Sequence, residues 1–187
     1  MLAPLGRLAG LTAATFAPAV ASYTAVLVAD TALPAWHGGG RQLPFVFVGS
    51  AAASAAGLAL AAVSRAQAAP ARRLAVMGGV LELVATRRML SDLGMVAEVY
   101  HKDRAGRLHR TATAATATGA VLAALGAKRS RLLALAAGVA LLTGSACTRF
   151  AVFYAGQASA DDPRYTVIPQ QERIKQRQAG AAASAPS

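Results

Sequence analysis

The chain is poor in the residues on which metal centres and haems depend. Of its 187 residues, only one is a cysteine, Cys147, and three are histidines. One cysteine cannot form an internal disulfide bond, and it cannot hold an iron–sulfur cluster, which commonly takes four thiolates. The histidines His37, His101 and His109 lie between the long apolar runs rather than inside them. This placement argues against a haem held by this chain alone, because a bundle haem needs axial histidines that project into the bundle.

Charged and aromatic residues are scarce as well. Asp, Glu, Lys and Arg make up 14% of the chain, against about 25% in a typical soluble domain. The net charge is +11, but aromatic residues are too few, and too deep in apolar runs, for the base stacking of a nucleic-acid-binding protein. The sequence also contains no Gly-rich phosphate loop, no zinc-ligand spacing and no nucleophile triad. Its basic residues gather in short connections between apolar runs, which is typical of membrane topology and of contact with anionic lipid.

Long apolar runs are the main feature of the sequence. About 20 apolar residues span the hydrocarbon layer of a bilayer, and runs this continuous favour helices over alternating barrel strands. Five such runs predict transmembrane helices at 8–33, 45–63, 73–99, 111–127 and 132–157. We therefore predict an all-α integral membrane bundle over residues 1–157. A polar tail, 158–187, follows, and we expect its end to be disordered.

Two further expectations concern topology. Ala19-Val20-Ala21 resembles a signal-peptidase site, but the apolar run continues through Val28, which favours a retained helix over a cleaved signal. Lys and Arg residues are slightly more numerous on the side of the C-terminus, which favours a cytoplasmic C-terminus in a multi-pass protein of the cell membrane.

Glu82 is the sharpest candidate for chemistry, because an ionisable group within a membrane span is costly to bury. It can carry protons, pair with an arginine (Arg87, Arg88 or Arg149) or face a water-filled groove. Arg88 and Asp92 stand four residues apart and are predicted to form a local ion pair. Arg149, near the middle of the last run, needs a partner, and Glu82 is one candidate.

A second group of candidates surrounds the exit of the first run. Tyr23 and Asp30 are seven residues apart, so both project from nearly the same helix face. With Trp36 and His37 they are predicted to form a polar and aromatic cluster at one membrane surface. The alternative is that the aromatic residues are interfacial anchors, which lie at the headgroup level without any chemistry.

Two segments resemble the NrfD / polysulfide reductase membrane-subunit family. The first has a tyrosine-led helix, Pro34-x-Trp36 at its exit, and Leu43-Pro44 opening the next helix. The second, 144–153 with 162–170, is similar to the C-terminal end of the actinobacterial type. Members of the family usually have eight or more helices. The resemblance covers only the C-terminal portion of that pattern, so the helices of the N-terminal portion are missing here.

The resemblance implies a membrane anchor subunit of an oxidoreductase rather than a stand-alone enzyme. Such subunits bind a quinone, menaquinone or ubiquinone, and hold no haem or iron–sulfur cluster of their own. They pass electrons between the quinone and a partner iron–sulfur subunit, beside a molybdopterin catalytic subunit, while protonatable side chains handle the protons. A separate chain would supply the missing helices. The alternatives are a non-redox transport or assembly protein and a non-functional fragment.

Overall fold

The computed structural model describes residues 3–183, which are almost entirely helical and contain no strand. The long helices are α1 (Ala3–Ala29), α3 (Leu43–Ala62), α4 (Ala69–Asp92), α5 (Asp103–Val121), α6 (Arg131–Asp161) and α7 (Arg164–Ala183). Between them lie the short helix α2 (Pro34–Gly38), the 3₁₀-helix η1 (Gly94–Tyr100) and the π-helical turn η2 (Leu122–Gly126). The all-α fold class is therefore confirmed.

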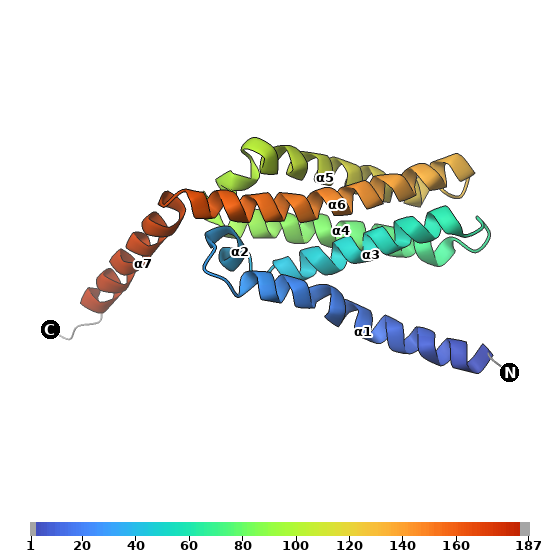
Figure 1. Ribbon diagram of the computed structural model, residues 1–187, viewed down its shortest axis with the longest axis horizontal. Coiled ribbons are helices and arrows are strands. Elements are labelled where there is room, and N and C mark those ends of the chain that lie inside the picture. Colours follow the sequence, from blue (N-terminus) through green and yellow to red (C-terminus); the bar gives the residue numbers. More distant parts are fainter. Residues whose placement is uncertain (1–2, 184–187) are drawn as a thin grey trace.

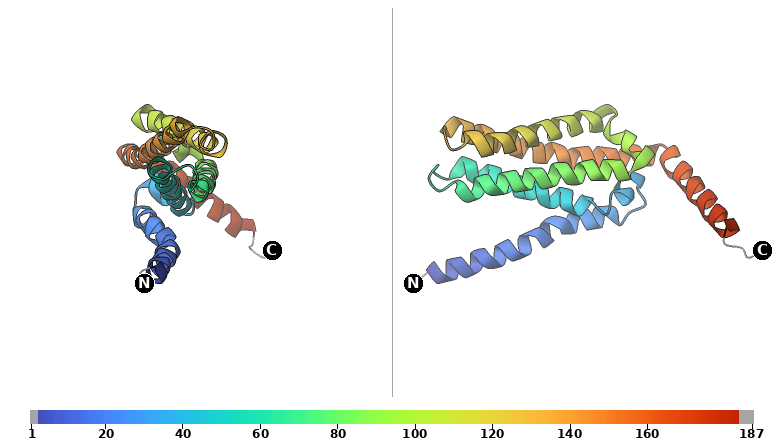
Figure 2. Two further views of the ribbon diagram at one scale, coloured as in Figure 1. Left: turned by 90° about the vertical axis from the view of Figure 1, so that its right-hand side faces the viewer. Right: turned by 180° about the vertical axis from the view of Figure 1, so that it is seen from behind.

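Helices α3 to α6 lie side by side as a four-helix bundle, and α1 runs along one side of it (Figures 1 and 2). The N-terminal half of α1 diverges from the bundle, and α7 projects away from the opposite end. One end of the bundle, here called the α2 end, holds α2, η1, the start of α5 and the start of α7. The other end holds the N-terminus of α1 and the α3–α4 and α5–α6 connections, and is called the basic end.

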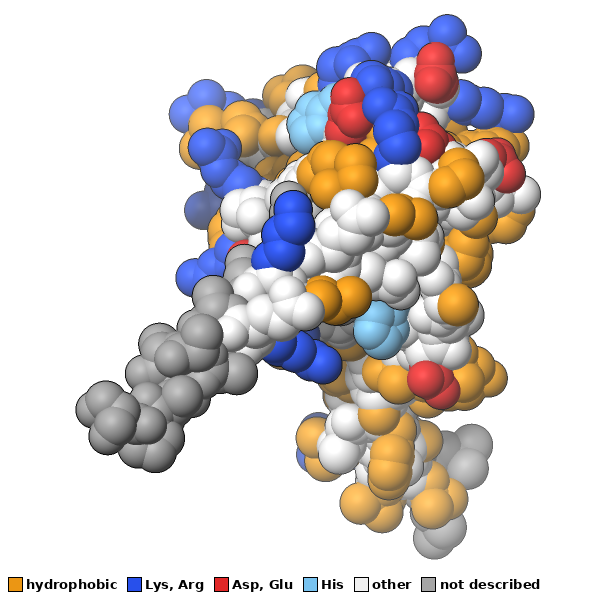
Figure 3. Space-filling model, turned by 90° about the vertical axis from the view of Figure 1, so that its left-hand side faces the viewer, with side chains coloured by type: hydrophobic (Ala, Val, Ile, Leu, Met, Phe, Trp, Pro, Cys, Tyr) orange, Lys and Arg blue, Asp and Glu red, His pale blue; other side chains and the backbone are white. Residues whose placement is uncertain are grey.

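The charges of the two ends differ. At the basic end, the described residues carry seven Lys or Arg side chains and no Asp or Glu, namely Arg7, Arg65, Arg72, Arg73, Lys128, Arg129 and Arg131. The α2 end mixes both signs (Figure 3). Arg131 also has a local structural role, because its guanidinium donates to the backbone oxygens of Leu60 and Val63, each at 2.9 Å. These carbonyl groups lie at the C-terminal end of α3, where no backbone N–H of the helix is available to bond to them. Arg131 therefore fastens the α5–α6 turn to the end of α3.

Small residues set the distances between the helices. A Cβ added to Gly49 of α3 would stand 2.6 Å from the backbone nitrogen of Glu82, and one added to Gly78 of α4 would stand 2.6 Å from that of Ala53. Gly57 of α3 and Gly138 of α6 meet backbone to backbone in the same way. Such small residues let helix backbones approach each other closely, as these contacts show.

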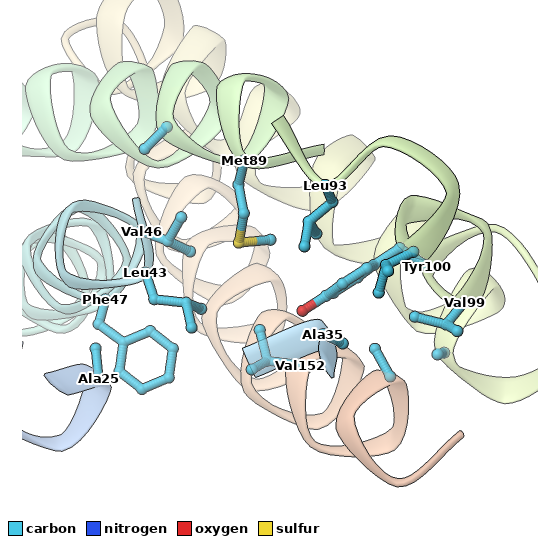
Figure 4. Close-up of a cluster of buried hydrophobic side chains, with 14 of the residues drawn as sticks. Ala25, Ala35, Leu43, Val46, Phe47, Met89, Leu93, Val99, Tyr100 and Val152 are labelled. Carbon is cyan, nitrogen blue, oxygen red and sulfur yellow. The ribbon is translucent and has the colours of Figure 1, made fainter. Parts of the chain in front are cut away.

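Two hydrophobic clusters lie inside the bundle. Near the α2 end, large side chains such as Phe47, Met89 and Tyr100 fill the space (Figure 4). Towards the basic end, the buried cluster consists of alanines with the two leucines Leu60 and Leu141. The bundle is therefore tightest where its side chains are smallest.

Three helices are long and apolar enough to cross a membrane, by length and composition: Pro4–Ala29, Leu43–Ala62 and Arg131–Asp161. Helices α4 and α5 have similar lengths but carry more charged residues. The structure thus supports three of the five predicted spans on this criterion.

The observed boundaries differ most from the predicted ones at three places, and α1 also spans Ala3–Ala29 rather than 8–33. The third run was predicted to continue to 99, but α4 ends at Asp92 and η1 follows. Helix α5 begins at Asp103, ahead of the predicted 111, because its first two turns are rich in arginine and were assigned to a connection. The predicted polar tail contains helix α7, which continues to Ala183, and only residues 184–187 of the end expected to be disordered lie outside the described residues.

Substitution of Gly49 by alanine is expected to lower the stability of the bundle, because the methyl group would push α3 away from the backbone of α4. We expect a loss of about 1–3 kcal/mol, the usual effect of overpacking, seen as a lower thermal midpoint in detergent. The matched control is Gly10→Ala, where nothing lies within 4 Å of the added atom. Equal midpoints for the two variants would contradict this account of the α3–α4 contact.

A buried carboxylate and a surface pocket as candidate functional sites

The Glu82 side chain lies inside the bundle and is only 2% exposed. It projects from α4 towards the helices on the other side, because α4 turns its larger apolar side chains outward. Leu74, Met77, Val80 and Val84 are all exposed. The carboxyl group is therefore removed from the surface that these side chains form.

Hydroxyl groups from the neighbouring helices surround the carboxyl group of Glu82. The Thr148 hydroxyl of α6 donates to Oε1 at 2.5 Å, and the Thr116 hydroxyl of α5 donates to Oε2 at 3.4 Å. Ser50 of α3 and Ser145 of α6 are also buried, and the Ser50 hydroxyl donates to that of Ser145 at 2.9 Å. Each of the four bundle helices thus contributes a polar group to this layer.

No cation pairs with Glu82 among the described residues, where the salt bridges are Lys102–Glu98 and Arg164–Asp162. Arg149 is exposed, and its guanidinium lies over the Phe47 ring at 4.8 Å from the centroid. Of the arginines considered as partners for Glu82, none bonds to it. An ionised carboxylate buried without a cation is costly, so this environment favours the neutral carboxylic acid.

The structure does not join Arg88 to Asp92, which were predicted to form an ion pair. The Asp92 carboxylate instead accepts a hydrogen bond from the Gln42 side chain, which comes from the start of α3. The Arg88 backbone oxygen accepts from Ser91. The spacing of four residues allows an ion pair between Arg88 and Asp92, but Gln42 at the start of α3 lies close enough to bond to Asp92 instead.

The four residues at the exit of the first run are not held together as one cluster. Tyr23 is 60% exposed on α1, Asp30 is exposed just beyond it, and no hydrogen bond or ring contact within residues 3–183 joins the four. His37 stays at the surface, with its Nδ1 atom 3.3 Å from the Ala29 oxygen. Trp36 turns inward, where its indole nitrogen donates to the Val152 oxygen at 2.8 Å.

Trp36 therefore fastens α2 to α6. A Cβ at Gly156 of α6 would overlap the indole ring, so the ring lies directly on the glycine backbone. Next to it, the Ala35 nitrogen donates to the buried Ser159 hydroxyl at 3.2 Å. The contacts of Trp36 are structural, and they fix the position of α2 and of His37 on it.

A surface pocket of about 310 Å³ lies beside His37 at the α2 end. The turn after α1, the end of α4 and the start of α7 form its walls, and the polar residues among its lining are Thr31, His37, Asp92, Tyr165, Thr166 and Gln170. Its size falls at the lower end of the range for small-molecule sites. Of the four predicted cluster residues, only His37 lines it.

The start of α7 is docked by ionic contacts. The Tyr165 hydroxyl donates to Glu98 Oε2 at 3.1 Å, and Lys102 Nζ lies 2.5 Å from Glu98 Oε1. Lys102 and then Tyr165 hold the pKa of Glu98 below its ordinary value. The Asp162 carboxylate accepts from the side chain and the backbone nitrogen of Arg164, contacts that lower its pKa and cap the helix.

Sequence reasoning singled out Glu82 but missed the residues around it. Ser145 and Thr148 stand three positions apart on the last run, a spacing that places them on one helix face, so a signal was present. Thr116 lies in an alternating Thr and Ala segment that gives no such periodicity. His109 was left outside the helices because α5 was predicted to begin after it, yet it lines the interior of the bundle.

Comparisons of the chain with models of known protein families, with curated proteins and with solved structures give no match.

Replacement of Gly156 by alanine is expected to displace Trp36, because the methyl group would occupy the position of the indole ring. Trp36 is the only tryptophan of the chain, so its fluorescence reports on this contact alone. We expect a red-shifted emission and greater quenching by a water-soluble quencher. Gly6→Ala, at a position with nothing within 4 Å, should leave both unchanged. An unaltered spectrum in Gly156→Ala would contradict the contact.

Acid is expected to release the start of α7. Because the pKa of Glu98 is lowered in the folded chain, its stabilising contacts are complete above the ordinary value of 4.5 and are lost as the pH falls through the lower folded value. Amide hydrogen exchange of residues 164–168, corrected for its intrinsic pH dependence, measures this release.

Glu98→Gln is expected to reduce the protection of these amides already at neutral pH. The weaker acid dependence that remains in this variant should come from Asp162, whose pKa is also lowered. Protection that is unchanged both by acid and by Glu98→Gln would contradict the docking role of Glu98.

Proposed function

We propose that this chain is a multi-pass protein of the cell membrane with five spanning helices, α1, α3, α4, α5 and α6. The supporting observation is the distribution of side chains, which reverses that of a soluble bundle. Glu82, Ser50, Thr116 and Thr148 are buried, whereas large apolar side chains face outward along α1, α3, α4 and α6, and Val121 and Leu125 do so at the end of α5 and in η2. Lipid is the solvent that makes such a surface favourable.

The lengths of the less apolar helices fit this proposal. On α4, the 13 residues between Arg73 and Arg87 include only Glu82 as a charge, and Glu82 faces inward. At 1.5 Å per residue they span about 20 Å, and long arginine side chains at both ends can extend towards the headgroups. On α5 and η2, residues 111–127 contain no charge and span roughly 26 Å.

Within the membrane, we propose a role as a quinone-linked anchor subunit of a multi-subunit oxidoreductase. The observation that carries this is Glu82, a carboxyl group enclosed by hydroxyl groups from three other helices and bonded to no cation in the described residues. A merely structural carboxyl group would gain most from an arginine, of which the chain has several nearby. A protonatable group without a fixed counter-charge is suited to taking up and giving back a proton.

The pocket beside His37 fits a quinone headgroup. Quinone carbonyl oxygens need hydrogen-bond donors, and a quinone supplies two-electron, two-proton chemistry when bound. His37 Nδ1 lies against the Ala29 oxygen and donates to it, so Nε2 of the neutral ring is an acceptor suited to a hydroxyl group of a quinol, and Trp36 holds the helix that carries it. The Gln170 side chain adds a donor for a quinone oxygen to the lining. We also propose that Tyr23 on α1 and Asp30 just beyond its end take part in handling the quinone or its protons.

The partners in this proposal are an iron–sulfur subunit, a molybdopterin catalytic subunit and a chain that supplies further helices. The outer face of α1 supports the last of these, because Leu11, Phe16, Val20 and Tyr23 are each at least 60% exposed. A groove of about 370 Å³ also separates α1 from α3 and α4 and is lined by apolar residues.

The test is electron transfer in the complex purified from membranes. Reduction of the partner's iron–sulfur cluster by a quinol analogue should fall in Glu82→Gln, which keeps the shape of the side chain and one acceptor oxygen but cannot ionise. We expect a loss of roughly a hundredfold, the lower end of what one positioned proton-transferring group contributes. His37→Ala should weaken quinol binding, and Arg41→Ala, an exposed residue outside the pocket lining, is the control.

Other outcomes distinguish the alternatives. A chain that purifies without an iron–sulfur protein, and whose Glu82→Gln variant alters ion or solute flux but not electron transfer, would be a transporter. A chain that does not accumulate in the membrane would be a non-functional fragment. Either result would overturn the redox proposal.

A further inference from the structure

The hydroxyl group of Tyr100 is one of two buried side-chain polar atoms, with Gln42 Oε1, that lack a hydrogen-bond partner among the described residues. Tyr100 is 1% exposed, and its oxygen finds no hydrogen-bond partner among the described residues. The ring enters from η1, and its oxygen points into the cluster towards the space between Met89, Leu93 and Val152 (Figure 4). A buried hydroxyl without a partner typically costs about 1–3 kcal/mol, so such a group calls for an explanation.

A small cavity in the bundle explains it. The cavity has a volume of about 20 Å³, and its lining includes Glu82, Tyr100, His109, Thr116 and Thr148. A site of this size has room for one water molecule, and a buried water needs two to four polar partners. The cavity walls supply them, because they bring the carboxyl group and the phenol together with an imidazole and two hydroxyl groups.

From this cavity, aromatic and imidazole rings continue to the surface at the α2 end. The His109 ring lies edge-on to the Tyr100 ring, with centroids 6.2 Å apart, and edge-on to the His101 ring at the same separation. His109 is half-buried, whereas His101 is exposed. Arg110 lies next to His109 and donates to the His101 backbone oxygen at 3.5 Å.

In the other direction the interior offers no such route. Beyond Glu82 the backbone of α4 is in contact with Gly49, and Gly78 lies against Ala53. The buried cluster that follows contains only alanine and leucine side chains as far as the basic end. A polar connection from Glu82 therefore leads to one side of the bundle only.

We propose that a water molecule bound in this cavity joins Glu82 to Tyr100 and His109, and that Glu82 exchanges its proton with the aqueous phase at the α2 end through this path. One proton moves and no electron does. The water, held by a hydrogen bond to the Tyr100 hydroxyl, accepts the proton from the Glu82 carboxyl group and gives one of its own to His109. His109 takes it on one ring nitrogen and releases another from the second nitrogen towards His101 and solvent. The biological use of this proton rests on the proposed redox function.

The experiment follows the carboxyl stretching band of Glu82 by infrared spectroscopy in the purified full-length chain in lipid nanodiscs. The band is identified as the one that Glu82→Gln removes, and its shift after transfer to D₂O gives the exchange rate. Tyr100→Phe removes only a hydroxyl without a protein partner, so we expect it to keep the fold. We expect exchange in this variant to slow by at least about tenfold, within what one proton-transferring group contributes.

His109→Gln should slow exchange as well. The matched control is Tyr154→Phe, because Tyr154 lies outside the cavity, against the guanidinium of Arg104. It should exchange at the wild-type rate, and the emission of Trp36 verifies folding in each variant. Wild-type exchange in Tyr100→Phe, or the absence of a carboxyl band that Glu82→Gln removes, would overturn the path. Neither quinone nor partner subunit is present, so this failure is separate from failure of the redox proposal.

Discussion

The structure depends on how one buried carboxyl group is hydrogen-bonded. Glu82 is buried with no cation bonded to it in the described part of the chain, so its hydrogen-bonding capacity must be met by neutral groups on the facing helices. Hydroxyl side chains are short, and they reach the carboxyl group only if the helix backbones approach closely. The hydrogen bonds to the Glu82 carboxyl group therefore require the tight packing of the helices.

The glycine contacts show how that requirement is met. Gly49 touches the backbone of Glu82 itself, so the contact that sets the distance between α3 and α4 lies at the level of the carboxyl group. Gly144 brings α6 equally close to Thr116, one of the two residues whose hydroxyl bonds to Glu82. Bulkier buried side chains such as Tyr100 and Met89 lie nearer the α2 end, and both line the small cavity.

The sequence was sufficient for the helical class, for the membrane-like runs and for Glu82, because each depends on local composition. It was insufficient for the partners of Glu82, since these come from three other helices and their register is set by packing. His109 shows the same limit. Arg107 and Arg110 on either side of it are typical of a connection between helices, yet α5 begins before them. The imidazole of His109 turns inward, while both arginine side chains stay exposed. For Trp36 the sequence indicated the exit of the first run, but not that its ring packs on the backbone of Gly156 in α6.

The two candidate sites differ in how far they depend on other chains. The layer around Glu82 is enclosed by α3 to α6, and all of its polar groups belong to this chain. The pocket beside His37 instead lies at the edge, between the end of α1 and the start of α7, where the proposed helix-supplying chain would meet α1. Proton chemistry at Glu82 can therefore be intrinsic to this bundle. Selection of a quinone at the pocket would be shared with whatever chain covers α1, and the two activities can be separated experimentally.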